Sequence, residues 1–140
     1  MPFEAKWYLE GRVSTARDWG EITVEEMRES NKVSLEHIRT GTPPVHLLID
    51  TSAIDQLPRS FLPMLKEIEA FRHEPNMGWT IMITNSSLLH FFGVLSSNLI
   101  KMPFRAVSSY AEANAVLERV DPSLAGLLPQ NWVVEPVDRP

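Results

Sequence analysis

Two short polar runs contain the residues of this sequence that are best suited to chemistry. Each run follows a short apolar stretch, so each is expected at the end of a strand. In an open α/β sheet, ligands bind at the edge where the carboxyl ends of neighbouring strands meet. We therefore predict a polar ligand site at the strand ends, formed by Asp50, Thr51, Ser52, Asn85, Ser86 and Ser87. The competing interpretation, which we favour, is that these residues only cap the helices that follow.

The other parts of a catalytic site are missing from the sequence. Asp50 and Asp55 could pair as two acids, but nothing places a base, an oxyanion donor or a metal ligand beside them. The sequence has no Gly-x-Ser-x-Gly elbow to present a nucleophile and no glycine-rich loop to hold a phosphate. We therefore predict that the protein is not an enzyme and has no catalytic residue and no cofactor.

Metal chemistry is not indicated either. The sequence contains four histidines, namely His37, His46, His73 and His90. Their spacing differs from the paired spacing that brings two imidazoles onto one metal ion. The absence of cysteine excludes thiolate metal sites, thiolate nucleophiles and disulfide bonds. We predict no metal site, and an isolated histidine is usually a surface or packing residue, with His46 as the exception if it is buried.

Composition indicates a single domain with an ordinary hydrophobic core. The chain has 140 residues, of which 44% are hydrophobic, and this is enough to bury one core. Its formal net charge is −5 and its basic residues are scattered, which argues against nucleic acid as a partner. The start of the chain lacks the basic and apolar regions of a secretory signal. Together with the absence of cysteine, this leads us to expect a cytoplasmic protein.

The first forty residues predict a β-hairpin followed by a helix. Apolar and polar residues alternate over 3–10, which predicts a strand with only its odd-numbered side chains buried. A turn then leads into a second strand over 12–19. Thr23 and Glu26 have the spacing of a capping box, so a helix of about four turns is expected to begin there. Gly41 and the prolines after it end that helix.

The rest of the chain alternates short apolar runs with segments of helical spacing. Strands are expected at 45–49, 79–84 and 103–107, and helices at 60–72, at 88–100, and from a cap at Ser108 or Ser109 to Val120. This order predicts an α/β fold in which a mixed sheet of four to five strands, parallel in its interior, is packed by about four helices. We expect one domain over 1–125 and a proline-rich C-terminal tail over 126–140 that is not a domain of its own.

The segment over 88–100 is the most unusual part of the sequence. We predict an apolar interface or ligand face formed by Leu88, Leu89, Phe91, Phe92, Leu95 and Leu99, beside a stripe that contains Gly93 and Ser97. The segment is too short to span a bilayer, and Lys101 is the only basic residue available to a membrane-surface helix. A core helix with an exposed apolar margin is the favoured interpretation, followed by a dimer face or an apolar-ligand groove.

Three stretches carry a family resemblance that covers roughly residues 3–125. They are the entry to the first helix over 20–26, the strand and aspartate over 45–50, and the opening of the last helix over 109–113. In the order and spacing of these stretches the chain resembles the STAS family, the sulfate-transporter and anti-sigma-factor-antagonist domains, and in particular its SpoIIAA-like branch. The resemblance implies a SpoIIAA-like fold and a regulatory or binding function.

The resemblance also draws attention to one serine. In STAS domains that act as phospho-switches, a serine of an Asp-Ser-Ser-Gly motif at the start of a helix receives a phosphoryl group. The matching stretch here is Pro58-Arg59-Ser60-Phe61, in which proline replaces the aspartate and phenylalanine replaces the glycine. Free amides and the helix dipole would favour a phosphate at Ser60. Ser60 is therefore a phosphoacceptor or simply a helix N-cap, and we favour the N-cap.

Two functions remain open from the sequence. The first is a non-enzymatic STAS-like regulatory module that binds a protein partner, or a second copy of itself, through a helix face. The second is a small carrier or sensor that holds an apolar or lipid-like ligand between the sheet and the third helix. We favour the first on the family resemblance alone. An exposed apolar helix patch would support the first function, and an apolar cavity would support the second.

Overall fold

A computed structural model describes residues 3–56, 61–132 and 134 of the chain. The described residues contain five strands, which form one sheet in the order in which they occur along the chain. They are β1 (Phe3–Leu9), β2 (Val13–Glu21), β3 (Val45–Gln56), β4 (Met77–Ile83) and β5 (Phe104–Val107). β1 is antiparallel to β2, and the other neighbouring pairs are parallel. The prediction of a mixed sheet with parallel inner strands is confirmed.

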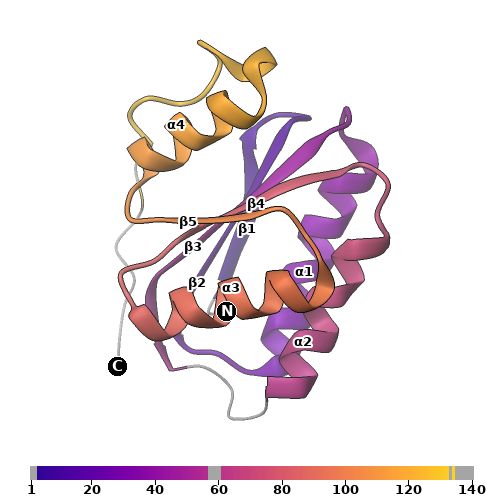
Figure 1. Ribbon diagram of the computed structural model, residues 1–140, viewed down its shortest axis with the longest axis vertical. Helices are drawn as coiled ribbons and strands as arrows, with labels where there is room; N and C mark the ends of the chain where they lie inside the picture. Colours follow the sequence, from indigo (N-terminus) through magenta and orange to yellow (C-terminus); the bar gives the residue numbers. More distant parts are fainter. Residues whose placement is uncertain (1–2, 57–60, 133, 135–140) are drawn as a thin grey trace.

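The helices cover both faces of this sheet. Those within the described residues are α1 (Val24–Thr40), α2 (Phe61–Glu69), α3 (Ser87–Ile100) and α4 (Tyr110–Val120), with short 3-10 turns η1 (Ala70–His73) and η2 (Pro122–Leu124). In Figure 1, α1, α2 and α3 lie on one side of the sheet and α4 lies on the other. None of these helices is long and apolar enough to cross a membrane.

The direction of the crossovers explains why three helices share one face. The chain moves across the sheet in a constant direction, from β2 to β3, β4 and β5. A connection between parallel strands is right-handed in nearly all proteins. Successive right-handed connections in one direction must all pass over the same face, so α1, α2 and α3 form one layer. Only α4, which follows the last strand, is free to pack on the opposite face.

Side chains alternate along β3 and therefore pack in two separate cores. Leu48 points to the α4 side, where it packs in a cluster with Ile81 and Leu117. Leu47 points to the other side, where it packs with Ile38 of α1 and Phe71 of η1. Because each face of the central strands is covered by helices, their sequence is apolar on both sides.

Side-chain caps fix the starts of two helices where the sequence predicts them. The Thr23 hydroxyl accepts a hydrogen bond from the Glu26 backbone N–H at 3.2 Å at the start of α1. The Ser109 hydroxyl accepts one from the Glu112 N–H at 3.1 Å at the start of α4. Both helices therefore begin at residues whose side chains satisfy free backbone amides.

The predicted end of the third strand is wrong. The sequence predicted a strand over 45–49, but β3 continues to Gln56 and includes Asp50, Thr51 and Ser52. The polar side chains are accommodated because β2 extends alongside this part of β3, with Arg17 paired to Asp50 and Glu21 to Gln56. Backbone hydrogen bonding to a neighbouring strand prolongs β3 where its own composition predicts a break.

The segment after α4 packs onto the α4 side of the sheet. Leu124 and Leu128 are buried in the larger core. The rings of Trp132 and Tyr8 are in contact, with 4.7 Å between their centroids, and the Tyr8 hydroxyl donates to Asn114 Oδ1 at 2.7 Å. Tyr8 is consequently the most buried residue of β1. The prediction that this strand buries only odd-numbered side chains is wrong, because the C-terminal segment covers its other face.

Candidate functional site

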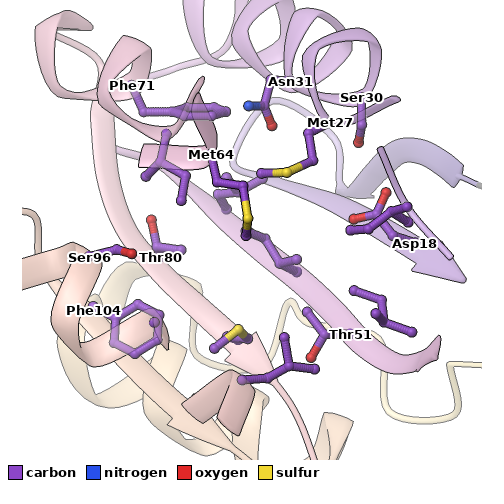
Figure 2. Close-up of a pocket in the computed structure, with 18 of the residues that line it drawn as sticks. Asp18, Met27, Ser30, Asn31, Thr51, Met64, Phe71, Thr80, Ser96 and Phe104 are labelled. Carbon is purple, nitrogen blue, oxygen red and sulfur yellow. The ribbon is translucent and has the colours of Figure 1, made fainter. Parts of the chain in front are cut away.

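A cavity of about 130 Å³ lies between the sheet and the layer formed by α1, α2 and α3. Figure 2 shows side chains from strands and helices converging on it. The strands β2 to β5 and all three helices of this layer contribute to the wall. Most of the wall is apolar, and its aliphatic and aromatic members include Ile22, Leu47, Ile49, Ile68, Phe71 and Phe104.

Methionines form an unusually large part of this wall. Four of the six methionines in the sequence line the cavity, namely Met27, Met64, Met82 and Met102. They come from α1, α2, β4 and the loop before β5, so they surround the cavity. Methionine is unbranched and flexible and has a polarisable sulfur. The cavity can therefore adapt its shape to its contents.

α3 turns one leucine and two small residues toward the cavity. Leu89, Gly93 and Ser96 are one turn apart, are buried, and line the cavity. A Cβ atom on Gly93 would lie 2.5 Å from Met82 Cε and 2.5 Å from Phe104 Cζ. The close approach of α3 to β4 and β5 therefore depends on a residue without a side chain at this position.

The six residues predicted as one apolar face of this helix are divided between its two sides. Leu89 is buried and lines the cavity, whereas Phe91 is 64% exposed and Leu99 is 54% exposed. Leu95 is half-buried. The side chains of Leu88 and Phe92 lie outside the described part of the structure. Binding of a partner or ligand by this set stays a prediction.

Two buried hydroxyl groups in the cavity wall have no hydrogen-bond partner among the described residues. They are Thr80 Oγ1 on β4 and Ser96 Oγ on α3. Thr80 is 8% exposed and Ser96 is 3% exposed. By contrast, the polar groups of Thr51 and Asn31 in the same wall donate to backbone carbonyl oxygens. Buried polar groups without a partner are uncommon in native proteins, so these two hydroxyls need an explanation.

Asp18 of β2 adds an acid to the wall. Burial raises the pKa of Asp18 to about 7, and the negative charges of Glu26 and Asp50 act in the same direction. A carboxyl group with this pKa changes between its protonated and ionised forms near neutral pH. Among the described residues that line the cavity there is no lysine, arginine or histidine, so Asp18 has no cation beside it there.

Side chains alternate between the two faces of β3, and this separates the residues of the polar site predicted at the strand ends. Asp50 faces α4, where its carboxylate accepts hydrogen bonds from the Tyr110 hydroxyl and the Ser52 hydroxyl, each at 2.6 Å. Thr51 faces the cavity and donates to the Ile83 carbonyl at 2.7 Å. Neighbouring side chains of a strand point to opposite faces, so the three residues cannot form one cluster.

The second half of that predicted site lies at the start of α3. The Ser86 hydroxyl accepts a hydrogen bond from the Leu89 N–H at 3.3 Å, so Ser86 caps the helix, as the favoured interpretation expected. Asn85 and Ser87 are exposed. The structure therefore does not bring the six polar residues together, and ligand binding by any of them stays a prediction.

Comparison with known proteins identifies the fold. No family model matches the sequence, and no curated protein matches it at a significant level. Among solved structures, the chain is similar to an uncharacterised protein of the DUF3478 family with a SpoIIAA-like fold from Shewanella loihica PV-4, with a TM-score of 0.60. The sequences are 14% identical, over 82% of this chain and 91% of that one. The fold is SpoIIAA-like. At this identity the similarity shows the fold and leaves the function to be argued from the site.

By the resemblance to STAS domains, their phospho-switch serine is predicted to correspond to Ser60. This residue lies outside the described residues, and α2 begins directly after it at Phe61. Both interpretations of Ser60 in this SpoIIAA-like domain, as phosphoacceptor and as helix N-cap, stay predictions.

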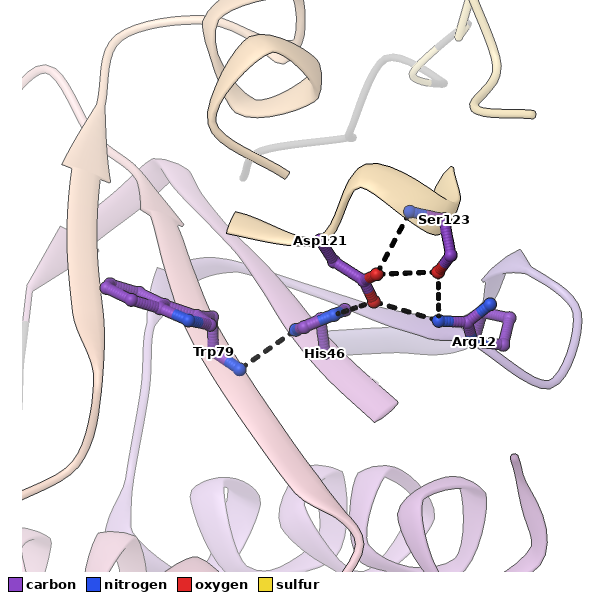
Figure 3. A network of polar contacts seen from close by, with 5 residues as sticks. All are labelled: Arg12, His46, Trp79, Asp121 and Ser123. Carbon is purple, nitrogen blue, oxygen red and sulfur yellow. Dashed lines mark hydrogen bonds and ion pairs between the residues drawn. The ribbon is translucent and has the colours of Figure 1, made fainter. Parts of the chain in front are cut away.

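A buried histidine network joins the start of β3 to η2 on the α4 side (Figure 3). His46 is 1% exposed, and its Nδ1 accepts a hydrogen bond from the Trp79 backbone N–H at 2.9 Å. Its Nε2 therefore carries the proton and donates to Asp121 Oδ2 at 2.9 Å. The Arg12 guanidinium donates to the same oxygen at 2.8 Å and to the Ser123 hydroxyl at 2.9 Å.

This network resembles a catalytic pair, but its contacts join elements of the fold. Burial acts to raise the pKa of Asp121, but hydrogen bonds from Ser123 and His46 and the charge of Arg12 outweigh it, so that pKa lies below its ordinary value. Both ring nitrogens of His46 are occupied, one by a backbone amide and one by a carboxylate. The imidazole consequently has no lone pair with which to accept a proton from a substrate or bind a metal ion.

Apart from Thr51, sequence reasoning missed the polar residues of the cavity. Asp18, Thr80 and Ser96 come from elements far apart in the chain, and none belongs to a motif. Two weak signals were available. Thr80 interrupts an apolar strand, and Ser96 lies on the same helical row as Leu89 and Gly93.

Proposed function

We propose that this SpoIIAA-like domain binds one small, mostly apolar molecule in its cavity and acts as a carrier or sensor without catalysing a reaction. The observation that supports this proposal is the cavity of about 130 Å³, with a largely apolar and methionine-rich wall. An engineered apolar cavity of ~150 Å³ binds benzene, so a ligand of roughly six to nine non-hydrogen atoms is expected. Drug-sized ligands need about 300–1,000 Å³ and are too large.

Because of the cavity, we place the carrier or sensor ahead of the protein-interaction module favoured from the sequence. An apolar cavity between the sheet and α3 is the feature that supports a carrier or sensor over a protein-interaction module. The absence of catalysis in the proposal is supported by His46, whose ring nitrogens are both occupied. It is also supported by Asp50, whose carboxylate is engaged by Tyr110 and Ser52 on the face opposite the cavity.

The methionine methyl groups provide a direct test of binding. The protein is labelled with carbon-13 at these methyl groups and titrated with toluene, and the signals are followed by NMR. We expect saturable shifts for Met27, Met64, Met82 and Met102, with a Kd of ~0.1–1 mM. Met77 packs in the core beside Phe71 but does not line the cavity, so its signal should stay in place. Absence of saturable shifts with both toluene and phenol, or shifts of equal size at Met77, would contradict the proposal.

A pair of variants on α3 distinguishes filling of the cavity from a general effect on the helix. Ser96→Leu places an aliphatic side chain in the cavity, because Ser96 is buried and lines it. Asn98→Leu adds the same side chain at an exposed position of the same helix. We expect the first variant to lose toluene binding and the second to keep it, with both proteins folded by circular dichroism.

A second candidate function is supported by the outer side of α3. Phe91, Val94 and Leu99 are 64%, 39% and 54% exposed, which is unusual for large apolar residues that lie near one another on a helix. A protein partner or a second copy of this chain would cover them. This candidate corresponds to the interaction module considered from the sequence.

A further inference from the structure

We infer that the ligand of the cavity is uncharged and carries one hydrogen-bonding group, a hydroxyl or a carbonyl, that pairs with the hydroxyls of Thr80 and Ser96. The inference rests on the proposed function and specifies the chemical class of the ligand. A simple phenol or a short-chain alcohol or ketone belongs to this class. A pure hydrocarbon and a carboxylate do not.

The two hydroxyls are the first reason. Both are in the cavity wall, at least nine-tenths buried, and without a hydrogen-bond partner among the described residues. A hydroxyl can donate one hydrogen bond and accept others, so the pair can serve either a carbonyl or a hydroxyl on a ligand. Leaving such groups unpaired away from water is unfavourable, and a ligand that pairs with them recovers this loss.

The position of the two hydroxyls is the second reason. Thr80 on β4 is paired in the sheet with Phe104 on β5. Gly93 of α3 lies against the Cζ end of the Phe104 ring, and Ser96 follows one turn later on the same side of the helix. Figure 2 shows Thr80 and Ser96 at the same end of the cavity, beside Phe104, and Asp18 at the opposite end. The inferred ligand therefore has its polar group at the hydroxyl end of the cavity and its apolar part in the rest of the cavity.

The charge of the wall is the third reason. No lysine, arginine or histidine occurs among the described residues of the wall, whereas Asp18 contributes an acid. A carboxylate ligand would be buried without a cation and would be repelled by Asp18 when that residue is ionised. A ligand cation bound at the hydroxyl end would be separated from Asp18 by two strand spacings, about 10 Å, because β3 lies between β2 and β4. An uncharged group avoids both costs.

Matched probes test this inference by titration calorimetry or by the methionine NMR signals. Phenol and toluene have the same shape and differ in one hydroxyl group. Benzamide and benzoate also have nearly the same shape and differ in charge. We expect the wild-type protein to bind phenol, toluene and benzamide, and to bind benzoate at least ~10-fold more weakly than benzamide at pH 8, where both the probe and Asp18 are ionised.

Two variants assign the polar contact. Thr80→Val and Ser96→Ala each remove one hydroxyl with little change in volume. We expect each variant to bind phenol ~3–10-fold more weakly and toluene equally well or more tightly, because only phenol loses a hydrogen bond. Thr15→Val is the matched control, since the Thr15 hydroxyl is also buried and unpaired among the described residues but lies outside the cavity. It should leave the affinity for phenol unchanged.

The outcomes separate this inference from the proposal on which it rests. If neither toluene nor phenol binds the wild-type protein, both the proposed function and the inference fail. If toluene binds but the affinity for phenol is the same in the wild type, Thr80→Val and Ser96→Ala, only the inference fails. Binding of benzoate as tight as that of benzamide would also overturn it, because an anion would then be accepted.

Discussion

Asp18 is the residue whose chemistry depends most strongly on its place in the fold. In the sequence it is one of 18 acidic residues, in the middle of a strand. In the folded protein its carboxyl group lies in an apolar wall, and burial raises its pKa to about 7. Because the unfolded chain exposes this group to water, its protonation differs between the two states and makes stability depend on pH.

We predict that Asp18→Asn stabilises the protein at pH 7 and reduces the dependence of its stability on pH. The folded-state pKa lies above the unfolded value, so the folded state holds the proton more tightly and stability is lost as the pH rises from about 4 to about 7. Asparagine carries no ionisable proton. The change in the free energy of unfolding caused by the substitution should therefore be ~1–3 kcal/mol more stabilising at pH 7 than at pH 4. Urea unfolding at several pH values measures this difference. If the free energy of unfolding depends on pH in the same way in both proteins, Asp18 is not the titrating group.

α3 has two sides of different composition and exposure. Its inner side carries Leu89, Gly93 and Ser96 and closes the cavity. Its outer side carries the exposed Phe91 and Leu99. At Gly93 the cavity side leaves no room for a side chain, because the helix packs closely against Met82 of β4 and Phe104 of β5. Phe91 and Leu99 lie on the outside, where a partner could cover them.

If a second copy of the chain covers the outer side of α3, Phe91→Ser should weaken self-association by at least ~10-fold, because an exposed aromatic side chain at the centre of an interface contributes strongly to binding. Sedimentation velocity over a range of concentrations measures this effect. Leu127→Ser is the matched control, since Leu127 is 56% exposed but lies beyond α4. A wild-type protein that stays monomeric at every concentration would contradict self-association through this face.

At the scale of the whole molecule, the cavity follows from the topology. Three right-handed connections in one direction place α1, α2 and α3 on one face of the sheet, and the cavity lies where their side chains meet it. The other face is closed by α4 and the segment that follows it, which together bury Tyr8, Leu124 and Leu128. The protein therefore has one well-packed face and one face with room for a ligand.

We predict that the segment after α4 contributes to the stability of the entire domain. Leu128→Ala should lower the free energy of unfolding by ~2–4 kcal/mol, because Leu128 is 4% exposed and packs in the larger core. The neighbouring change Leu127→Ala should cost less than about 0.5 kcal/mol, because Leu127 is exposed. Chemical denaturation of the two variants gives the comparison. Equal effects would mean that this segment does not pack as described.

Local signals in the sequence were sufficient to predict most of the fold. The caps at Thr23 and Ser109 depend on residues within three positions, and both helices begin where these signals place them. The order of strands and helices was also readable, and it restricted the fold to a mixed sheet with right-handed crossovers. The end of β3 could not be predicted from the sequence, because pairing with β2 extends that strand beyond its own apolar run.

The sequence by itself determined the fold class, the order of the elements, the absence of cysteine chemistry and the presence of an apolar segment over 88–100. Only the tertiary structure decided which side of that segment faces inward and that Asp50 and Thr51 lie on opposite faces of the sheet. It also decided that Asp18, Thr80 and Ser96 line one cavity. The physical reason is range: capping and periodicity act over a few residues, whereas a cavity is formed by side chains that only the packing of distant elements brings together.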